Sequence, residues 1–524
     1  MRIGVNCYEL NRHMGGMRQY FHRLFGHLLV HDSSNDYVFF AREQAVEELD
    51  RLASDRWREH WVPIQTQEDI DVGRSNLDLY FCPFSIIWPR PVRAPSVVTI
   101  HDLQEMYFPD FFRPLDLFNR ALHLPGSTRS ADAVVTVSEF TKQTVEEHHG
   151  VSGRRIVSSP LCVGETFLRA LAAPLAGDAP FERFLLYPAN RWRHKNHAAL
   201  LEALRRLRDD EGLRVRLVLT GHDVGGGPPV EELIREMGLQ DQVRSVGYVS
   251  ATEIVSLYRQ AAGLIFPSLF EGFGLPLLEA MTAGCPAAVS RIPSLMEIGG
   301  EHALYFDPHS PDEIALAIRR LWSDSALCER MAAGGRLRAQ GFHPQRMAEA
   351  HLQAFEIARR RYSHTRYWVR RVALERLHAR RVRRRFRDHL DSPPAGLGVE
   401  SGIRVRFDRG WHQLEGDAEN WWRWSKGPAS ITITSDECRR VALEADALSA
   451  AAPNSIDLLL DGRSQIRWEI PSTQNGFGPL ATVVLDLRQG ASRLEIRSRE
   501  PAVQFDGDPR KLAVAVKNLR FRPL

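Results

Sequence analysis

The chain has 524 residues, of which 44% are hydrophobic, 25% charged and 9% aromatic. This composition is that of a soluble globular protein, and it excludes the fibrous and intrinsically disordered classes. A chain of this length is too long to fold around a single hydrophobic core, so we expect about three domains. The formal net charge of +3 predicts no general attraction to nucleic acid, which we do not expect as a partner.

The six cysteines are scattered singly, without the paired spacing of a zinc site, and we expect reduced, packed thiols. The N-terminal segment enters an apolar strand without the features of a secretory signal. No apolar run approaches the roughly 18 residues that a membrane-spanning helix needs. We therefore expect a cytoplasmic protein whose contact with a membrane is at most peripheral.

Residues 1–170 alternate short apolar runs with helical patterns. The expected strands are Ile3–Cys7, Tyr37–Ala41, Leu77–Phe81, Val97–Ile100 and Ala133–Val137. The expected helices are Met17–His31, Leu115–Ser130 and Phe140–His149. Such alternation builds a parallel sheet covered by helices on both faces, which predicts a Rossmann-like domain.

A stretch rich in Ala, Pro, Gly and Asp at 168–180 is typical of an interdomain linker, and a second alternation follows it. The expected strands there are Phe184–Tyr187, Val215–Thr220, Val243–Val246, Gly263–Phe266, Ala287–Ser290 and Leu304–Phe306, with helical patterns ending near Arg361. Ligands of doubly wound sheets bind outside the carboxyl ends of the strands. Two such domains facing each other therefore predict a cleft between them.

The longest motif of the chain is Phe266-Pro-Ser-Leu-Phe-Glu-Gly-Phe-Gly-Leu-Pro-Leu-Leu-Glu-Ala-Met-Thr-Ala-Gly-Cys-Pro286, which lies between an expected strand and a helix. Gly272 and Gly274 allow the backbone to approach a ligand, and the helix after them offers unpaired N–H groups and a positive dipole end. These features predict a seat for a diphosphate. Glu271 before the seat and Glu279 within the helix can accept hydrogen bonds from sugar and ribose hydroxyls, whereas a plain turn with solvated carboxylates is the alternative.

This motif resembles that of the family 4 glycosyltransferases, whose fold is the two-Rossmann-domain GT-B type. The resemblance implies a cleft between residues 1–175 on the acceptor side and residues 176–345 on the nucleotide-sugar side. It implies a retaining hexosyltransferase, with Gly272, Phe273, Gly274, Leu275 and Glu279 binding the donor and Glu271 orienting the transferred sugar.

Three further segments resemble the same family. Gly15 and Gly16 follow the first strand, as in the family's glycine loop near donor phosphate and acceptor, although a simple strand-to-helix turn is an equal alternative. His101 follows the strand 97–100, where the family has a histidine that contacts the sugar, and a structural histidine is its alternative. Ser138 also resembles a family position, and it is equally expected to be a helix N-cap.

A departing nucleoside diphosphate gathers negative charge, which either a divalent ion or fixed cations must meet. Lys195 fits the family position for a diphosphate-binding lysine, but the arginine that normally precedes it falls at Asn190. Either Arg191 or Arg193 substitutes for that arginine, or Lys195 acts with the helix dipole alone. The Asp-x-Asp spellings at Asp69-Ile-Asp71 and Asp506-Gly-Asp508 do not lie in a context that favours a metal site. We therefore expect no metal and no cofactor beyond the donor itself.

The resemblance extends to mannosyl- and rhamnosyltransferases of surface-polysaccharide assembly, so GDP-mannose leads among the donors and a glycan or lipid-linked acceptor is expected. Departure of the phosphate and attack by the acceptor from the same face are favoured. The alternative is a non-catalytic glycan-binding or scaffold protein built on a decayed transferase. His101, Lys195, Glu271 and Glu279 are all present, which favours the enzyme.

Residues 346–395 form a return helix and a basic segment, in which 359–390 hold thirteen arginines and two acids. This segment could lie on an anionic membrane, pack on the enzyme, or serve as a solvated connector, and the first is favoured. Residues 396–524 alternate with period two between turns, which predicts an antiparallel β-sandwich. Its clustered tryptophans 411, 421, 422 and 424 could stack on sugars or form core, and Asp508 and Arg510 are expected to be a structural pair.

Overall fold

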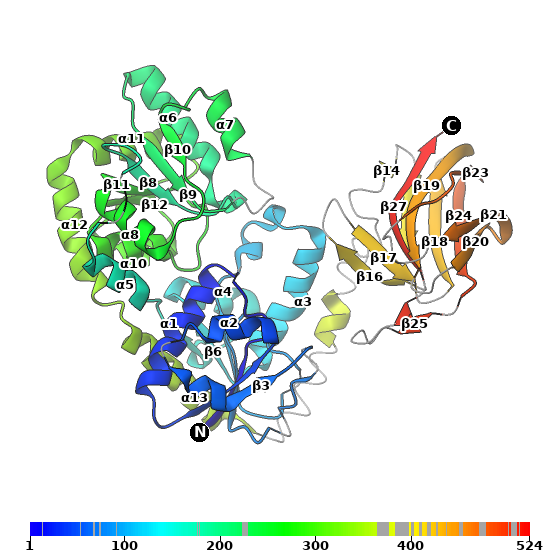
Figure 1. The fold of residues 1–524 in the computed structure, drawn as a ribbon, viewed down its shortest axis with the longest axis horizontal. Coiled ribbons are helices and arrows are strands. Elements are labelled where there is room, and N and C mark those ends of the chain that lie inside the picture. The colour runs from blue at the N-terminus through cyan, green and yellow to red at the C-terminus, as the bar shows by residue number, and fades with distance from the viewer. Residues whose placement is uncertain are drawn as a thin grey trace. The chain divides into compact units, whose positions relative to one another are not determined.

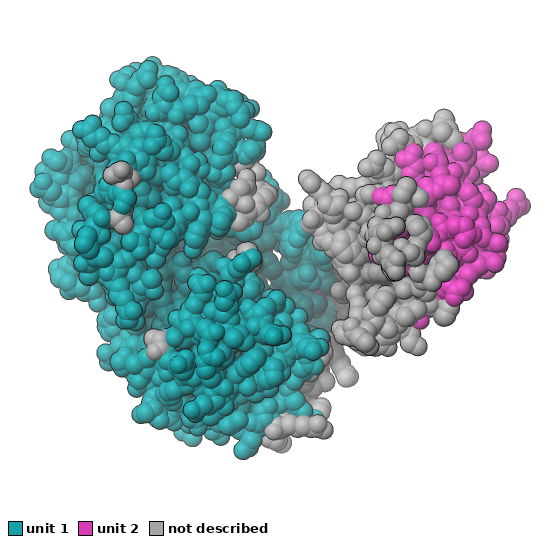
Figure 2. Space-filling view, in the orientation of Figure 1, with its two compact units in different colours: residues 1–379 teal, residues 380–524 magenta. Residues whose placement is uncertain are grey.

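In the computed structural model the described residues are 1–363 without 13, 53, 67–68, 73–74, 91, 176, 178 and 223–228, then 377–382, and from 398 to 523 a β-rich part without 400–402, 408–410, 417–420, 426–427, 436, 450–453, 471–477, 501, 505–510 and 513. The chain folds as two compact units, residues 1–379 and 380–524 (Figure 2). No helix among the described residues is long and apolar enough to cross a membrane.

The first half of the first unit is a seven-stranded parallel sheet in the order β3-β2-β1-β4-β5-β6-β7. Its strands are β1 (Arg2–Asn6), β2 (Asp36–Ala41), β3 (Trp61–Pro63), β4 (Leu79–Cys82), β5 (Ser96–Ile100), β6 (Ala133–Thr136) and β7 (Ile156–Ser158). The helices are α1 (Gly16–His31), α2 (Val46–Leu49), α3 (Pro114–Ser130), α4 (Glu139–His149) and α5 (Glu165–Ala172) (Figure 1). Val97 of β5 belongs to one buried cluster and Val98 to another, so both faces of the sheet are covered.

The second half is a six-stranded parallel sheet in the order β10-β9-β8-β11-β12-β13. Its strands are β8 (Leu185–Pro188), β9 (Leu217–Thr220), β10 (Val243–Ser245), β11 (Gly263–Phe266), β12 (Ala287–Ser290) and β13 (Leu304–Phe306). Its helices are α6 (His197–Glu211), α7 (Val230–Glu236), α8 (Ala251–Gln260), α9 (Leu275–Ala283), α10 (Pro293–Gly299), α11 (Pro311–Ser323) and α12 (Ser325–Ala339). The expected pair of Rossmann-like domains is confirmed.

The expected linker at 168–180 is wrong in its first part, because α5 covers residues 165–172. Phe167 of this helix is buried, and its ring lies 6.0 Å from that of Tyr258 on α8. The Ala- and Pro-rich composition gave no clear helical signal, although α5 is amphipathic and its apolar side packs against the second domain.

The helix α13 (Pro344–Arg361) follows the second domain in sequence but packs against α1 and strands β4 to β7 of the first. His351 is its buried polar anchor, with Nε2 2.6 Å from the hydroxyl of Tyr20 and Nδ1 2.7 Å from the carbonyl oxygen of Met347. A buried hydrogen bond from α13 to α1 therefore fixes the returning chain on the first domain.

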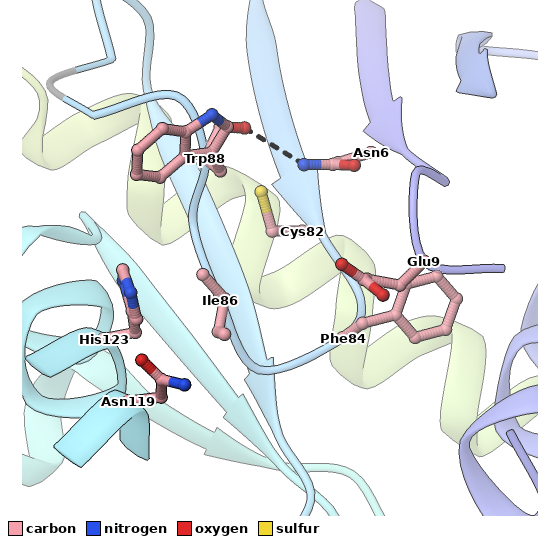
Figure 3. A pocket seen from close by; sticks show the side chains of 8 residues that line it. All are labelled: Asn6, Glu9, Cys82, Phe84, Ile86, Trp88, Asn119 and His123. Carbon is pink, nitrogen blue, oxygen red and sulfur yellow. Dashed lines mark hydrogen bonds between the residues drawn. The ribbon is translucent and has the colours of Figure 1, made fainter. Parts of the chain in front are cut away.

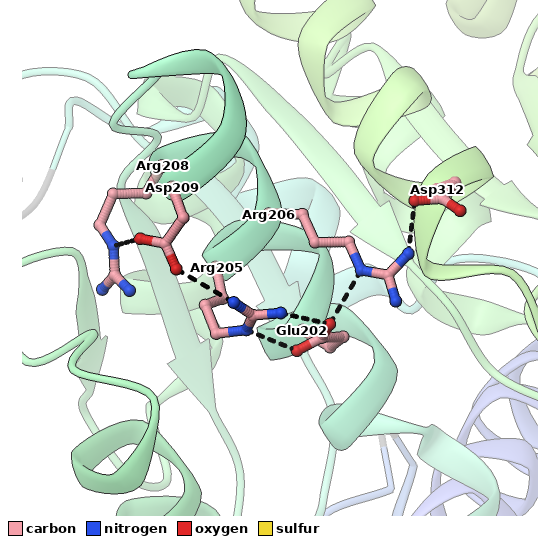
Figure 4. Close-up of polar contacts among 6 residues, drawn as sticks. All are labelled: Glu202, Arg205, Arg206, Arg208, Asp209 and Asp312. Atoms are coloured by element: carbon pink, nitrogen blue, oxygen red, sulfur yellow. Dashed lines mark hydrogen bonds and ion pairs between the residues drawn. The ribbon is translucent and has the colours of Figure 1, made fainter.

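A row of ion pairs runs along α6 and reaches α11 (Figure 4). Glu202 accepts hydrogen bonds from Arg205 and Arg206 at 2.8 Å, and Arg206 also lies 2.5 Å from Asp312. These side chains are partly or fully solvated, and such pairs contribute little to stability. The buried leucines on the other side of α6 attach it to the sheet: Leu200, Leu201, Leu204 and Leu207.

The two Rossmann-like domains meet where the loop 267–274 between β11 and α9 lies against the first domain. A Cβ at Gly272 would lie 2.0 Å from the carbonyl oxygen of His101, and the hydroxyl of Ser138 donates to the carbonyl oxygen of Gly272 at 2.6 Å. The ring of Phe270 beside it packs among those of Tyr107, Phe108 and Phe140. The contact therefore combines a backbone approach that only glycine permits with an aromatic cluster.

The second unit is a sandwich of two sheets around one hydrophobic core. One sheet contains β14 (Gly398–Val399), β16 (Trp411–Gly416), β17 (Trp421–Ser425), β19 (Arg439–Ser449), β22 (Gly478–Pro479), β23 (Val483–Leu487) and β27 (Val514–Pro523). The other contains β15 (Ile403–Phe407), β18 (Ala429–Ser435), β20 (Asn454–Leu460), β21 (Arg463–Ile470) and β24 (Gly490–Ser498), and β25 (Val503–Gln504) pairs with β26 (Lys511–Leu512). The expected antiparallel sandwich is confirmed, with β14 as a parallel addition to β27.

Several expectations for the C-terminal part fall on residues outside the described ones. These include Asp508, Arg510 and most of the basic segment 359–390, whereas residues 377–382 are helical. Strand β17 carries three of the clustered tryptophans, and the roles of their side chains stay predictions. His378 Nε2 lies 3.0 Å from the carbonyl oxygen of Ala121 on α3, so the basic segment touches the first domain at that point.

We predict that acid destabilises this protein through buried histidines. Burial lowers the pKa of His351 to about 4, against about 6.5 in an unfolded chain. The unfolded chain therefore binds more protons between these values, so stability is complete above pH 6.5 and falls towards pH 4, by about 1 kcal/mol per pH unit. Thermal unfolding from pH 7.5 to 5 should show a shallower pH slope for His351→Gln. The exposed control His309→Gln should keep the wild-type slope, and equal slopes for both variants would contradict this prediction.

We also predict that Gly272→Ala disturbs the contact between the domains. The added methyl would meet the backbone of His101, which cannot move aside as a flexible side chain can. We expect the melting temperature to fall by about 5 °C. Gly16→Ala is the matched control, because nothing lies within 4 Å of its added Cβ. A melting temperature of Gly272→Ala as high as that of the control would show that the two domains do not approach here.

Candidate active site

The strand-to-helix junction of the second domain is built from a buried strand, a glycine turn and a helix start. The four residues of β11 are fully buried between β8 and β12. Gly274 precedes α9 with a φ of 129°, and a Cβ there would lie 2.3 Å from Leu295. Both its conformation and its packing therefore require glycine. In the first turn of α9, Pro276 has no N–H, and the N–H groups of Leu277 and Leu278 donate to the carbonyl oxygen of Gly274 at 3.1 and 3.3 Å. The amides that can meet an anion here are therefore that of Leu275 and those of the glycine turn before it.

Phe273 and Leu275 flank Gly274 at the start of α9. The Phe273 side chain is buried and its ring lies 6.0 Å from that of Phe342, so it anchors the turn in the core of the second domain. Leu275 is half-buried and is the first residue of the helix. The contribution expected of both residues to donor binding would therefore come from their backbone amides.

Lys195 and Glu271 lie together at this junction. The Nζ of Lys195 is 2.5 Å from Oε1 of Glu271, and the side chains are 15% and 13% exposed. Asn196 fixes the lysine loop: it has a φ of 59°, and its amide donates to the carbonyl oxygens of Pro267 and Pro308 at 3.1 and 2.7 Å. Asparagine tolerates this left-handed conformation better than most residues. The sequence separates the ion pair by 76 residues, and the fold brings it together.

Glu279 lies in the second turn of α9 and contacts the first domain. Its Oε1 is 3.2 Å from Arg23 of α1, and the hydroxyl of Tyr258 donates to its Oε2 at 3.4 Å. Burial raises the pKa of Glu279, and the Arg23 guanidinium opposes that shift. The carboxylate is therefore held by a cation across the domain boundary.

Arg23 was not singled out by the sequence. Its side chain is only 7% exposed, it also donates to Gln19 at 2.8 Å, and its second guanidinium nitrogen is buried without a partner among the described residues. Its distance in sequence from Glu279 is 256 residues. No local pattern could have found this pair, because it depends on how the two domains pack.

Arg191 and Arg193, the two candidates for the missing arginine, are both engaged elsewhere. Arg191 donates to Glu231 at 2.6 Å and to Ser245 at 2.7 Å. Arg193 donates to the carbonyl oxygen of Asp110 at 3.0 Å and lies over the ring of Phe111. Arg193 therefore bridges the two domains, and Arg191 binds within the second.

His101 enters the site from the carboxyl end of β5. Its Nε2 lies 2.8 Å from the carbonyl oxygen of Pro83, and its ring meets that of Tyr20 edge-on at 4.8 Å. Burial lowers the pKa of His101, so the ring is neutral at pH 7. A neutral ring that donates from Nε2 to a carbonyl keeps Nδ1 as an acceptor, which suits a sugar hydroxyl.

The glycine loop before α1 and Ser138 complete the first domain's side. Gly15 has a φ of 54° and precedes α1, and neither Gly15 nor Gly16 has a neighbour within 4 Å in the direction of a side chain. Ser138 is the N-cap of α4, since its side chain accepts from Thr141 N, and it also contacts Gly272. The two alternatives stated for Ser138, a cap and a site residue, are therefore compatible.

Among the described residues, no group of three or more His, Cys, Asp or Glu side chains could hold a metal ion. Asp69 accepts hydrogen bonds from the backbone N–H groups of Gln65 and Thr66, which is the pattern of a turn. Asp506 lies outside the described residues.

Comparison with known proteins agrees with this architecture. Residues 179–338 match the family described as "Glycosyl transferases group 1", and residues 50–163 match "Glycosyltransferase Family 4". The chain is similar to the O-antigen chain mannosyltransferase B of Escherichia coli, with 27% identity over 270 residues that cover 50% of this chain and 70% of the relative. It is 26% identical to the O-antigen chain mannosyltransferase RfbU of Salmonella typhimurium over 232 residues, or 44% of this chain and less than two thirds (62%) of the relative.

Among solved structures, that of Anabaena HepE in complex with UDP-glucose is similar, with a TM-score of 0.50 and 16% identity over 68% of this chain and 98% of that one. At this identity the similarity supports the two-domain fold. The two family matches lie on the two parallel sheets, and the motif with Glu271 and Glu279 lies in the second. The chain belongs to the family 4 glycosyltransferases and is a nucleotide-sugar-dependent enzyme of the GT-B fold.

Proposed function

We propose that this protein is a retaining hexosyltransferase that moves a mannose-like sugar from a nucleotide diphosphate to a glycan or lipid-linked acceptor of surface-polysaccharide assembly. The observation that carries the proposal is the meeting of Lys195, Glu271 and the start of α9 with His101 of the other domain. The two sheets thus bring together a helix start that suits a phosphate, the carboxylate of Glu271 and the neutral ring of His101. This is the set of groups that a sugar diphosphate needs.

In this proposal the pyrophosphate lies at the amide end of α9, with Lys195 as its fixed cation. Glu271 then exchanges part of its contact with Lys195 for hydroxyls of the transferred sugar, and Glu279 accepts from the ribose. Arg23, across the domain boundary, opposes the rise in the pKa of Glu279 that burial causes. Preorganised cations and amides of this kind stabilise a leaving diphosphate without an ion, so the proposed enzyme needs no metal.

The proposed reaction breaks the bond between the anomeric carbon and the phosphate oxygen, and the acceptor oxygen forms the new bond on the same face. The acceptor proton passes to the departing phosphate oxygen, which leaves a nucleoside diphosphate and a glycoside of unchanged configuration. The roles of the protein groups are orientation and charge stabilisation: Glu271 and His101 Nδ1 hold sugar hydroxyls, and Lys195 meets the growing charge.

The donor is proposed from the relatives. Two of them are mannosyltransferases of O-antigen chains, which favours GDP-mannose. HepE binds UDP-glucose and shares the fold, which supports a nucleotide sugar in general. Peripheral contact with an anionic membrane through 359–390 belongs to the same proposal, because a lipid-linked acceptor lies at such a surface.

We predict that GDP-mannose and GDP raise the melting temperature of the wild-type chain, and that EDTA changes neither this shift nor the rate of donor hydrolysis. Lys195→Met should abolish the shift in melting temperature and lower the rate of donor hydrolysis about 100-fold, because the departing diphosphate loses the cation that stabilises its negative charge. Glu271→Ala should keep the shift with GDP and lose the additional shift with GDP-mannose.

Lys142→Met is the matched control. It removes one lysine charge, as Lys195→Met does, but Lys142 pairs with Glu139 within α4 of the first domain. It should behave as the wild type. Strict dependence on a divalent ion would overturn the metal-free proposal. Equal nucleotide binding by Lys195→Met and Lys142→Met would overturn the proposed diphosphate seat.

A further inference from the structure

Arg23, in the middle of α1, reaches out of the first domain and holds a carboxylate of the second. Its Nη2 lies 3.2 Å from Oε1 of Glu279, and the side chains of the pair are 7% and 14% exposed. The guanidinium also opposes the rise in the pKa of Glu279 that burial causes, and an ionised carboxylate is the stronger acceptor. Both the orientation of Glu279 and its capacity to accept hydrogen bonds therefore depend on a residue of the other domain.

Neighbouring segments restrict the movement of this pair. A Cβ at Gly164, which precedes α5, would lie 3.3 Å from Nε of Arg23. The hydroxyl of Tyr258 on α8 donates to Oε2 of Glu279 at 3.4 Å, and the Tyr258 ring packs against that of Phe167 on α5. The pair is thus held between α1, α8, α9 and the segment that leads into α5, so its geometry is set before a ligand arrives.

Both members of the pair keep hydrogen-bonding capacity that the protein does not use. A carboxylate offers about four acceptor sites, and Arg23 and Tyr258 each contact a different oxygen of Glu279. The Nη1 of Arg23 is buried and has no partner among the described residues. A buried donor without a partner is costly, so stability alone does not account for an arginine at this position.

Two other polar contacts of the first domain stay within it. Arg18, also on α1, pairs with Glu48 of α2. A cavity of about 410 Å³ lies at the carboxyl ends of β1 and β4, and in its wall Asn6 donates to the carbonyl oxygen of Trp88 at 3.0 Å (Figure 3). Both contacts fix the first domain alone. Arg23 differs from them because its acceptor is the carboxylate that the proposed function assigns to the ribose.

We propose that Arg23 is a positioning residue for the nucleotide, and that it holds the Glu279 carboxylate in the orientation that accepts the ribose hydroxyls of the donor. The first domain thereby takes part in recognising the nucleoside. This inference rests on the proposed function, in which Glu279 binds the ribose, and it adds the residue on which that contact depends. Loss of Arg23 should weaken the binding of nucleotides that have ribose hydroxyls more than the binding of nucleotides that lack them.

Isothermal titration calorimetry on the full chain with GDP and 2′,3′-dideoxy-GDP tests the proposal. The wild type should bind GDP at least about tenfold more tightly than the dideoxy analogue, because the hydroxyls bond to a charged group. Arg23→Met should reduce this preference to less than about threefold, mainly by weakening GDP. Arg23→Gln removes the charge but keeps a polar side chain, and it should reduce the preference as well if the methionine variant does not fold. A general loss of stability would leave the ratio of the two affinities unchanged.

Arg18→Met is the matched control, because it removes an arginine from the same helix whose partner Glu48 lies in the first domain. Its preference for GDP should equal that of the wild type. A wild-type preference in the folded Arg23 variants, an equal reduction in Arg18→Met, or no preference in the wild type would each overturn the role of Arg23 while GDP binding stands. Failure of the wild type to bind GDP would instead count against the proposed function, and this inference would fall with it.

Discussion

The backbone contact between Gly272 and His101 determines the geometry of the whole site. It brings the start of α9, which can hold a diphosphate, to the carboxyl edge of the first sheet, where a neutral histidine and a cavity lie. Because the contact involves main-chain atoms on both sides, it leaves no room for a side chain and little freedom for sliding. The two sheets are thereby held at a distance set by a glycine, and the aromatic cluster around Phe270 supports that distance.

Two ion pairs lie near this boundary, one within the second domain and one across it. Lys195 pairs with Glu271 within the second domain, and Arg23 of the first domain pairs with Glu279 of the second. Partly buried charges of this kind are costly unless each has a partner, so both carboxylates are held in place before a donor arrives. A sugar diphosphate would enter between groups that are already oriented, which reduces the reorganisation needed during reaction.

Much of this could be predicted from the sequence, because it depends on local pattern. The apolar strands of both sheets and the glycine turn before Leu275 follow from periodicity and from the conformations that glycine permits. The pairing of Arg23 with Glu279 could not, since it joins residues 256 positions apart through domain packing. The engagement of Arg193 with Asp110 was hidden for the same reason, and an alanine-rich composition hid α5.

The central claim is that amides of α9 and the Lys195 ammonium bind the pyrophosphate directly. A crystal structure of the protein grown with GDP in the presence of EDTA tests it most directly. We predict the β-phosphate within hydrogen-bonding distance of Lys195 Nζ and of the N–H groups at the start of α9, with no cation between them. A diphosphate bound away from this junction, or one that is bound only when a divalent ion bridges it to the protein, would contradict the account.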